Sequence, residues 1–154
     1  MMTLEMRKQM NKYISFICKG QFFALSINTI EKIVLYEEPV VVPETSDYIL
    51  GYTSYDGAPM PIIDLNRRFF DLETNVGELS KVVVVHWQDH RLGLLVDEVS
   101  NVQDYEKQEK DESLKDSEES YIVGTIYNND QIILEVDINK MFVDKAEAEL
   151  LRLL

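Results

Sequence analysis

The amino-acid sequence predicts a mainly β protein built from two related five-stranded β-barrels, with short helices and a C-terminal helix. Three observations favour this fold class. Short segments rich in β-branched and aromatic residues recur along the 154 residues, tight-turn residues separate them, and the sequence repeats itself. Each half offers five closely spaced strands, and closing a sheet removes its exposed edges, so two small barrels are expected.

The internal repeat is visible in two blocks of the sequence. Residues 48–69 match residues 121–142 without a gap at an offset of 73 (121 − 48), and both blocks contain Tyr-Ile-x-Gly followed by an aspartate and a phenylalanine. Residues 23–33 match residues 92–102 at an offset of 69 (92 − 23). The difference between the offsets implies a net insertion of four residues in or before the polar stretch Asp104–Ser120.

The repeat divides a single domain, residues 1–154, into two expected subdomains. The first spans about residues 12–72, the second spans about residues 81–143, and a C-terminal helix follows at residues 144–154. The expected strands are Tyr13–Cys18, Phe22–Ile27, Ile30–Tyr36, Ile49–Tyr55, Ala58–Ile63, Val82–Trp87, Leu92–Val96, Val99–Tyr105, Ile122–Tyr127 and Gln131–Val136. Tight turns join four pairs of them, at Lys19-Gly20, Asp56-Gly57, Gln88-Asp89 and Asn128-Asn129-Asp130.

Helices are expected after two equivalent aspartates, Asp64 and Asp137, which each end a strand. An aspartate in that place can accept backbone N–H bonds and cap a short helix, at Leu65–Phe69 and at Ile138–Phe142. The tail carries an apolar stripe at helical spacing, made of Ala146, Leu150, Leu151, Leu153 and Leu154. We therefore expect the tail to be a helix that packs on a barrel.

The chain is strongly acidic, with 28 acidic and 15 basic residues and a formal net charge of −13. This balance repels phosphate backbones and anionic membranes, so it argues against nucleic acid or lipid partners and leaves basic protein surfaces. Asp104–Ser120 is so rich in charge that we expect a solvated, mobile loop. The single cysteine, the lack of a long apolar run and the polar Met1–Lys12 segment favour the cytoplasm.

No catalytic arrangement stands out in the sequence, and no metal or cofactor is expected. None of the six glycines belongs to a phosphate-binding motif, and no metal-binding H-E-x-x-H motif is present. His86 and His90 flank a turn, so surface polarity explains them better than the alternative, a metal site with Asp89. Cys18 fits a small core residue better than a nucleophile. Duplicated caps explain the two aspartates better than an acid–base pair.

Gly51 and Gly124 lie inside expected strands at equivalent positions of the repeat. Glycine within a strand usually marks a bend, a bulge or a close backbone approach. A barrel corner is the simpler interpretation of these two glycines. A binding surface is the alternative, and the two are compatible.

The chain from about Tyr13 to Phe142 resembles the CheW-like domain of bacterial chemotaxis. The order and spacing of several segments carry the resemblance, namely Phe22–Ile27, Ile30–Ile33, Val42–Thr45, Tyr48–Gly51, Pro61–Leu65, Arg91–Val99 and Tyr121–Gly124. The resemblance implies two SH3-like barrels of five strands each, with no catalytic activity and no cofactor. It covers nearly the full chain.

Proteins of this family couple methyl-accepting chemoreceptors to the histidine kinase CheA, and the resemblance implies the same adaptor role here. The tip of the receptor's helical hairpin binds in a groove between the barrels, which implies contacts at Ile30, Lys32, Ile33, Gly51, Ser54, Asp56 and Gly57. The regulatory domain of CheA binds through barrel-to-barrel contacts, which we place around Leu94, Val96 and Val99, although strand alternation allows only about half of such residues to face outward. Such an adaptor is cytoplasmic and reaches membrane receptor arrays through its partners.

Two positions depart from the family pattern. Asp56 stands where the family usually has the arginine of an Asn-Leu-Arg-Gly hairpin, and Lys32 stands where it usually has the glutamate of Val-Gln-Glu-Ile. In the family these two side chains are thought to face one another near the receptor site. We hypothesise that Lys32 and Asp56 keep the pair with reversed polarity, and two unrelated surface charges are the alternative. A reversed pair would affect partner choice more than stability.

A second class of function is a small-molecule-binding or enzymatic β-barrel protein with a ligand between the barrels. Such a protein needs a deep pocket with convergent polar groups and perturbed ionisation. The sequence shows no cluster of that kind.

Overall fold

The computed structural model describes residues 11–105 and 120–154. Ten strands appear where strands were expected, within a few residues at each end. They are β1 (Asn11–Cys18), β2 (Gln21–Ser26), β3 (Ile30–Val34), β4 (Ile49–Tyr55), β5 (Ala58–Asp64), β6 (Lys81–Trp87), β7 (His90–Val96), β8 (Glu98–Tyr105), β9 (Ile122–Asn128) and β10 (Gln131–Val136). The helical elements are η1 (Ile27–Thr29), α2 (Leu65–Phe70), α4 (Ile138–Met141) and α5 (Lys145–Arg152). The charged stretch expected to form a mobile loop lies mostly in residues 106–119, outside the described residues.

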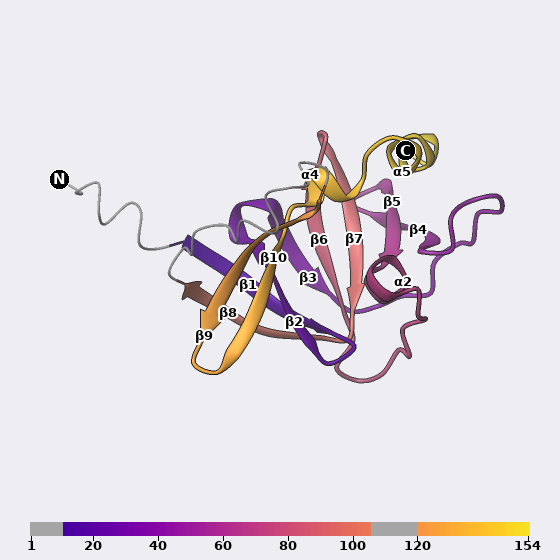
Figure 1. Cartoon of the computed structure of the whole chain (residues 1–154). Coiled ribbons are helices and arrows are strands. Elements are labelled where there is room, and N and C mark those ends of the chain that lie inside the picture. Colours follow the sequence, from indigo (N-terminus) through magenta and orange to yellow (C-terminus); the bar gives the residue numbers. More distant parts are fainter. Residues whose placement is uncertain (1–10, 106–119) are drawn as a thin grey trace.

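The strands form two five-stranded sheets, which Figure 1 shows side by side. Sheet A has the order β8-β1-β2-β10-β9, and sheet B has the order β3-β6-β7-β5-β4. Each sheet therefore combines a hairpin from one half of the sequence with three strands from the other half. The expected subdomains, residues 12–72 and 81–143, are not the units of the sheets, because hairpins β1–β2 and β6–β7 are exchanged between the halves.

The exchange preserves the symmetry of the repeat. The order of sheet A becomes that of sheet B when each strand is replaced by its repeat equivalent, β1 by β6, β2 by β7, β8 by β3, β9 by β4 and β10 by β5. The parallel pairs agree in register as well, since Glu135 lies opposite Ala24 and their equivalents, Ile62 and Gly93, lie opposite one another. A position in one sheet can therefore be compared directly with its equivalent in the other.

Neither sheet closes into a barrel within the described residues, so the two expected barrels are corrected to two five-stranded sheets. β8 and β9 are the edges of sheet A, and β3 and β4 are the edges of sheet B. The chain partly bridges the gap in sheet B, because Val40 and Tyr52 exchange backbone hydrogen bonds of 2.9 and 3.0 Å. Closure fails because this contact is an isolated bridge and not a continuous ladder.

The main hydrophobic core lies between the two sheets. It joins residues of sheet A such as Phe16 with residues of sheet B such as Leu94, and it includes the fully buried Trp87 and Phe142. Smaller apolar clusters cover the opposite faces, around Ile133 in sheet A and around the equivalent Met60 in sheet B. Burying apolar area on both faces of the central strands is the main source of stability in such a fold.

Both short helices begin at the expected aspartates. The carboxylate of Asp64 accepts hydrogen bonds from the backbone N–H groups of Asn66 and Arg67, and that of Asp137 accepts one from Asn139. The two caps are thus confirmed. Their surroundings differ, because Asp64 is buried and also accepts hydrogen bonds from the N–H and hydroxyl of Thr74.

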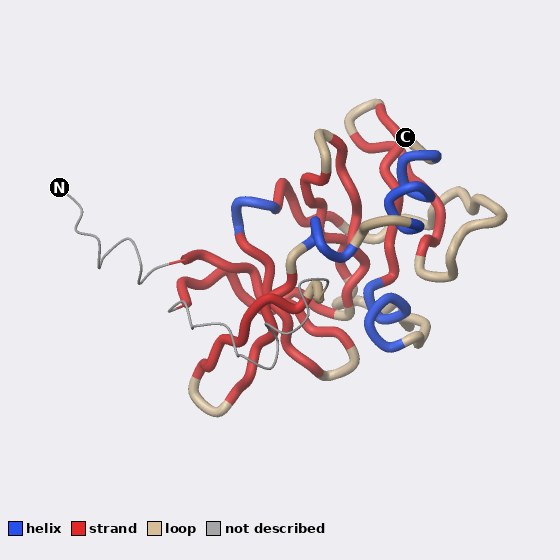
Figure 2. The backbone as a smooth tube through the Cα atoms, turned by 45° about the horizontal axis from the view of Figure 1, so that its top comes forward, coloured by secondary structure: helices blue, strands red, loops and turns tan. Residues whose placement is uncertain are grey.

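The C-terminal helix α5 packs at the end of sheet B, as Figures 1 and 2 show from two directions. Leu150 is buried in the main core, and the nearly buried Glu149 carboxylate accepts hydrogen bonds from the N–H and hydroxyl of Ser46, at 2.6 and 2.7 Å. The expected helical tail is confirmed. Ala146, Leu150, Leu153 and Leu154 of its apolar stripe pack against the core, whereas Leu151 is exposed. Among the described residues, no helix has the length and apolar character needed to cross a bilayer.

Candidate functional site

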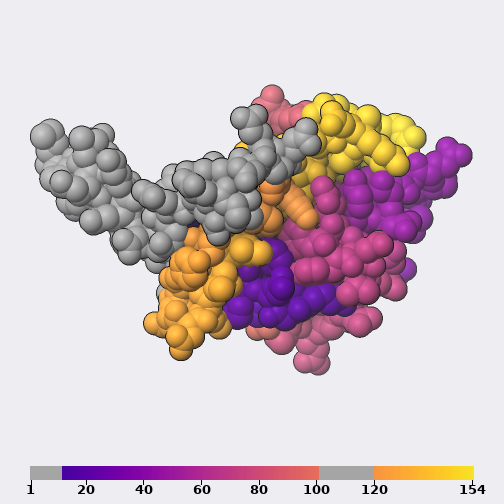
Figure 3. Space-filling model, viewed as in Figure 1, coloured from indigo at the N-terminus to yellow at the C-terminus, as the bar shows by residue number. Residues whose placement is uncertain are grey.

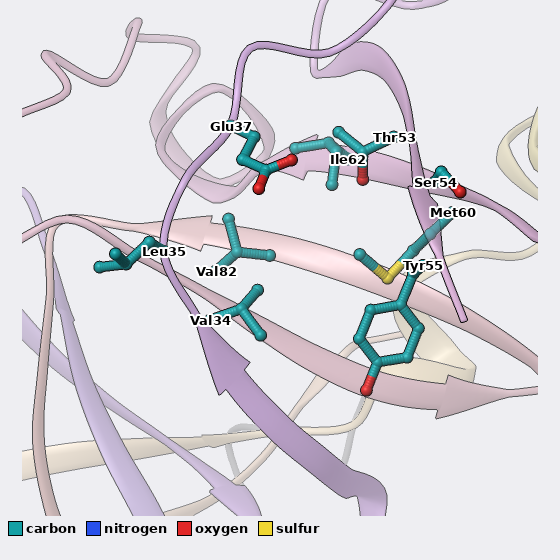
Figure 4. Close-up of a pocket in the computed structure, with 9 residues that line it drawn as sticks. All are labelled: Val34, Leu35, Glu37, Thr53, Ser54, Tyr55, Met60, Ile62 and Val82. Carbon is teal, nitrogen blue, oxygen red and sulfur yellow. The ribbon is translucent and has the colours of Figure 1, made fainter. Parts of the chain in front are cut away.

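The edge strands of sheet B, β3 and β4, approach one another across a surface hollow of about 340 Å³. We call it the β3–β4 hollow, and its lining residues are Val34, Leu35, Glu37, Thr53, Ser54, Tyr55, Met60, Ile62 and Val82. Figure 4 shows these side chains around one space, and they come from β3 and the segment that follows it, and from β4, β5 and β6. Its floor is apolar because Met60, Ile62 and Val82 belong to the small cluster on this face.

A polar clasp lies beside this hollow and is centred on Glu31. The pairing of β3 with β6 shifts register between Ile30 and Lys32, so Glu31 sits in a β-bulge and its side chain can turn toward β4 and β7. Its carboxylate accepts a hydrogen bond of 2.6 Å from the Tyr55 hydroxyl and lies 2.8 Å from Nε of Arg91. The clasp therefore ties the two edges of sheet B together through side chains.

Electrostatics within the clasp follow from these contacts. Hydrogen bonds from the Tyr55 hydroxyl and from Arg91 hold the pKa of Glu31 below its usual value. The same hydrogen bond, with the nearby carboxylate charge, raises the pKa of Tyr55 to about 12. Arg91 also lies over the Tyr55 ring, 5.6 Å from its centroid, in a cation–π contact. The lowered pKa of Glu31 keeps its carboxylate charged against Arg91 at neutral pH, and the raised pKa of Tyr55 keeps its hydroxyl protonated.

The hypothesis of a reversed pair between Lys32 and Asp56 is wrong in this structure. Both side chains are exposed, and among the described residues no ion pair joins them. The bulge at Glu31 explains the difference, because it gives the role of acidic partner to Glu31 and sets it against Arg91 of β7. Asp56 and Lys32 remain two separate charges at the rim of this surface.

The other residues expected to bind a receptor fall into two groups. Ser54 and Gly57 are exposed at the β4–β5 hairpin, close to the β3–β4 hollow. Ile30 and Ile33 are half-buried, and Gly51 is buried. Gly51 is thus a structural residue and cannot reach a partner.

Gly51 is required by a close approach of two backbones. Its φ is +139°, and a Cβ placed on it would lie 2.0 Å from the carbonyl oxygen of Val40. The interpretation of Gly51 as a site of close backbone approach is confirmed. Its equivalent Gly124 has an ordinary φ, and a Cβ there would approach only the side chain of Glu135, at 3.4 Å.

Comparisons with known proteins agree with this geometry. A sequence model of the CheW-like domain matches residues 12–146. The chain belongs to the CheW-like domain family. "Chemotaxis protein CheW" of Bacillus subtilis (strain 168) is 30% identical over 101 residues, which cover 66% of this chain and 64% of that protein. "Chemotaxis protein CheW" of Treponema pallidum (strain Nichols) is 22% identical over 147 residues, covering 91% and 86%.

Coverage of the CheW-like relatives varies. The chain spans just under two thirds of the Bacillus subtilis protein and 55% of the Klebsiella aerogenes protein of the same name, which is 28% identical over 91 residues. The solved structure of the scaffolding protein TtCheW from Thermoanaerobacter tengcongensis superposes with a TM-score of 0.79 at 22% identity, over 89% of this chain and 95% of that one. The superposition shows that the two chains share a fold.

The residues expected to contact the kinase are misplaced. Leu94 and Val96 are fully buried in the main core, and Val99 is half-buried against it. β7 is the central strand of sheet B and is covered on both faces, so its run of apolar residues is not half outward. Leu94 and Val96 therefore stabilise the CheW-like fold and cannot form a docking surface, whereas a contact at the half-buried Val99 stays a prediction.

An apolar surface that the sequence analysis missed lies on the segment after β3. Leu35, Val40 and Val41 are 71%, 58% and 75% exposed; Leu35 lines the β3–β4 hollow, and Val40 forms the bridge to Tyr52 of β4. Figure 3 shows this segment, in purple, projecting at the edge of the molecule. The sequence contains an indication of this surface, because the apolar run Val40–Val42 lies between two prolines and has no apolar counterpart in the other half of the repeat.

Apart from the clasp, in which Glu31 pairs with Tyr55 and Arg91, two further kinds of reactive group can be assessed at these surfaces, metal ligands and the cysteine thiol. Across residues 11–105 and 120–154, no three histidine, cysteine or acidic side chains form a metal-binding cluster. Cys18 is fully buried, and burial raises the pKa of its thiol well above its usual value. What the site offers is an apolar hollow with a charged rim, which is suited to binding a protein surface.

Proposed function

We propose that this chain is a non-catalytic adaptor that couples methyl-accepting chemoreceptors to the histidine kinase CheA in a bacterial chemosensory array. One observation carries the proposal: a member of the CheW-like family presents an open apolar surface at the edges of sheet B, next to exposed charged residues. Interfaces of this kind combine an apolar centre with a polar rim. The adaptor works in the cytoplasm and reaches membrane arrays through its protein partners.

The receptor contact is placed on the exposed members of the predicted set, Lys32, Ser54, Asp56 and Gly57. The half-buried Ile30 and Ile33 support this surface from beneath. The two charges lie at a rim and contribute more to partner choice than to affinity, because wrong-signed charges at an interface are penalised.

The kinase contact is placed on the apolar surface formed by Leu35, Val40, Val41 and the β3–β4 hollow. This surface replaces the buried residues of β7, which a partner cannot reach. Interfaces between folded domains need exposed apolar side chains at their centre, and this segment supplies three of them beside a hollow of about 340 Å³.

The alternative, an enzyme or small-molecule binder with a ligand between the two sheets, is not favoured. The space between the sheets is filled by the main core, including Trp87, Phe16 and Phe142, each at most 1% exposed. The β3–β4 hollow and two further hollows beside β5–β7 and β2–β10 lie at outer surfaces and not between the sheets.

Binding of the purified chain to two fragments from the same source, the regulatory domain of CheA and a receptor tip, tests this assignment. We expect Leu35→Asp to weaken kinase binding about tenfold or more and leave receptor binding unchanged. Asp56→Arg should alter receptor binding alone. Leu79→Asp, at a 60% exposed leucine on another loop, is the control. A chain that binds neither fragment but gains strong thermal stabilisation from a metabolite would overturn the proposal.

A further inference from the structure

The repeat places two equivalent hollows beside the two parallel strand pairs. The β5–β7 hollow of sheet B has a volume of about 190 Å³ and is lined by Tyr55, Ala58, Pro59, Met60, Asp89, His90, Arg91 and Leu154. The β2–β10 hollow of sheet A has a volume of about 320 Å³ and is lined by Gly20, Gln21, Phe22, Gln131, Ile132 and Leu134. With the offsets of 69 and 73, five lining positions of one hollow are the repeat equivalents of five in the other.

The two hollows differ in what covers them. In sheet B, Leu154, which follows α5, lines the hollow and gives it an apolar side chain from outside the sheet. In sheet A, every lining residue belongs to β2, to β10 or to the β1–β2 turn. Within residues 11–105 and 120–154, no segment outside the two strands and their turn supplies a side chain to that hollow.

The two hollows also differ in chemistry. Asp89, His90 and Arg91 line the hollow of sheet B, whereas Gly20, Gln21 and Phe22 stand at the equivalent positions and no charged side chain lines the hollow of sheet A. Beside that hollow, Tyr127 and Ile132 face one another across β9 and β10 and are 59% and 57% exposed.

These two exposed residues sit at the end of a hairpin that projects from the molecule. Figure 3 shows hairpin β9–β10, in orange, at the lower left of the surface. The equivalents of Tyr127 and Ile132 in sheet B are Ser54 and Pro59, a smaller and less apolar pair. An exposed apolar pair beside an apolar hollow is a feature that interaction sites share.

We propose that the β2–β10 hollow is a docking site for the end of an amphipathic helix from another protein, with an aliphatic side chain in the hollow and basic residues around it. The precedent for the occupant lies within this chain, where the segment after α5 supplies Leu154 to the equivalent hollow. The basic residues would lie outside the hollow, because no charged residue is among its described lining residues, while the chain as a whole carries a net charge of −13. The α5 helix of a second copy is not available, because Leu150 and Ala146 are buried against its own sheet B.

A peptide titration of the full chain tests this site without a receptor or a kinase. The probe is a synthetic peptide of residues 144–154 with Glu147→Lys and Glu149→Lys, which keeps the leucines of α5 and makes the helix basic. NMR spectra of the ¹⁵N-labelled protein should show saturable shifts at residues 20–22 and 127–134. Ile132→Asp should weaken binding about tenfold or more, because a charge would then stand at the apolar contact.

Two matched controls make the result specific. Leu79→Asp changes a leucine that is 60% exposed, close to the 57% of Ile132, and should leave peptide binding unchanged. A probe in which the last two leucines are replaced by serine should not bind. Thermal unfolding of Ile132→Asp should match that of the wild type, since the side chain is exposed.

Three results would overturn the proposal. The first is the absence of saturable shifts at the β2–β10 hollow. The second is a set of shifts at Ala58 and Ser46, which would mean that the probe displaces α5 from sheet B. The third is concentration-dependent shifts at residues 127–134 without peptide, which would identify a second copy of the chain as the occupant.

Discussion

Sheet A and sheet B have equivalent strand orders and registers, yet they carry different side chains on their outer faces. On the face away from the main core, sheet A holds Tyr13, whose hydroxyl donates a hydrogen bond of 3.1 Å to Glu135. The equivalent residues of sheet B are Val82 and Ile62, and both line the β3–β4 hollow. The hydrogen-bonded pair Tyr13 and Glu135 in sheet A therefore occupies the place at which sheet B has the β3–β4 hollow.

The clasp shows the same divergence. Glu31 of the edge strand β3 pairs with Arg91 of the central strand β7, whereas the equivalents in sheet A are Ser100 and Phe22, which cannot form an ion pair. The duplicated backbone thus supports two different surfaces, one with a charged rim and one whose hollow is lined by apolar side chains and by Gln21 and Gln131. The repeat accounts for the shared strand order, and the outer surfaces differ at positions where the two copies carry different side chains.

The largest expected difference between the sheets concerns the two repeated glycines. Gly51→Ala places a Cβ 2.0 Å from the Val40 carbonyl oxygen at a φ of +139° and should lower the free energy of unfolding by more than about 3 kcal/mol. Gly124→Ala meets only a flexible side chain at 3.4 Å and should change stability by less than about 1 kcal/mol. Urea unfolding measures both. Equal losses would show that the close approach at Val40 does not exist.

The second comparison concerns the two caps. Asp64→Ala leaves the buried N–H and hydroxyl of Thr74 without their partner, as well as the helix cap, and should cost about 2–3 kcal/mol. Asp137→Ala removes one hydrogen bond, from Asn139, at a partly exposed cap and should cost about 1 kcal/mol. Thermal or urea unfolding gives the two values. An Asp137 variant as unstable as the Asp64 variant would contradict the burial of Thr74.

The clasp predicts a pH dependence that belongs to sheet B. The pKa of Glu31 is lower in the folded chain than in the unfolded chain, so its stabilising contribution is complete above the ordinary glutamate pKa of about 4.3 and is lost as the pH falls through the lowered value. Glu31→Gln should therefore be less stable than the wild type at pH 7, and the gap should narrow as the pH falls below about 4. Urea midpoints at both pH values measure the gap, and a gap that is the same at both would argue against the clasp.

At the alkaline end the sign is opposite for Tyr55. Its pKa is raised to about 12 in the folded chain, so its contribution is complete below the ordinary tyrosine pKa of about 10 and is lost as the pH rises through about 12. Tyr55→Phe should therefore remove the part of the stability loss at alkaline pH that comes from ionisation of the Tyr55 hydroxyl. It should leave the exposed fraction of the β3–β4 surface unchanged.

The smallest expected effect concerns Cys18, whose repeat equivalent is Trp87. Both residues are buried in the main core, and burial raises the pKa of the Cys18 thiol. A thiol reagent such as DTNB should therefore label the native chain at least about 100-fold more slowly than the chain in urea. This experiment tests access to the Cys18 thiol, and we expect no accompanying change in the free energy of unfolding of the native chain. Rapid labelling of the native chain would show that β1 opens readily at this point.

Much of the fold follows from local patterns in the sequence. Strands, tight turns, both capping aspartates and the C-terminal helix were predicted, because each depends on a few adjacent residues. The exchange of hairpins β1–β2 and β6–β7 was not predicted. Both hairpins carry the same repeat pattern, so a sequence cannot show whether β1–β2 pairs within its own half or with the other half.

The candidate site was predicted in part. Ser54, Asp56 and Gly57 are exposed at one surface, because a turn between two strands must face solvent. The pairing of Lys32 with Asp56 failed because the β-bulge at Glu31, which redirects the side chains of β3, leaves no local signal in the sequence. Leu94 was misplaced because an apolar run buried on both faces resembles a half-exposed strand in composition.

We propose that the outer surfaces of the two sheets, and not a catalytic or ligand-binding pocket, carry out the adaptor function. Cosedimentation of CheA with membrane vesicles that contain a chemoreceptor of the same source tests this claim most directly. CheA should sediment with the vesicles when the wild-type chain is added, and should stay in the supernatant without the chain or with Leu35→Asp. Sedimentation that is the same with and without the chain would contradict the account.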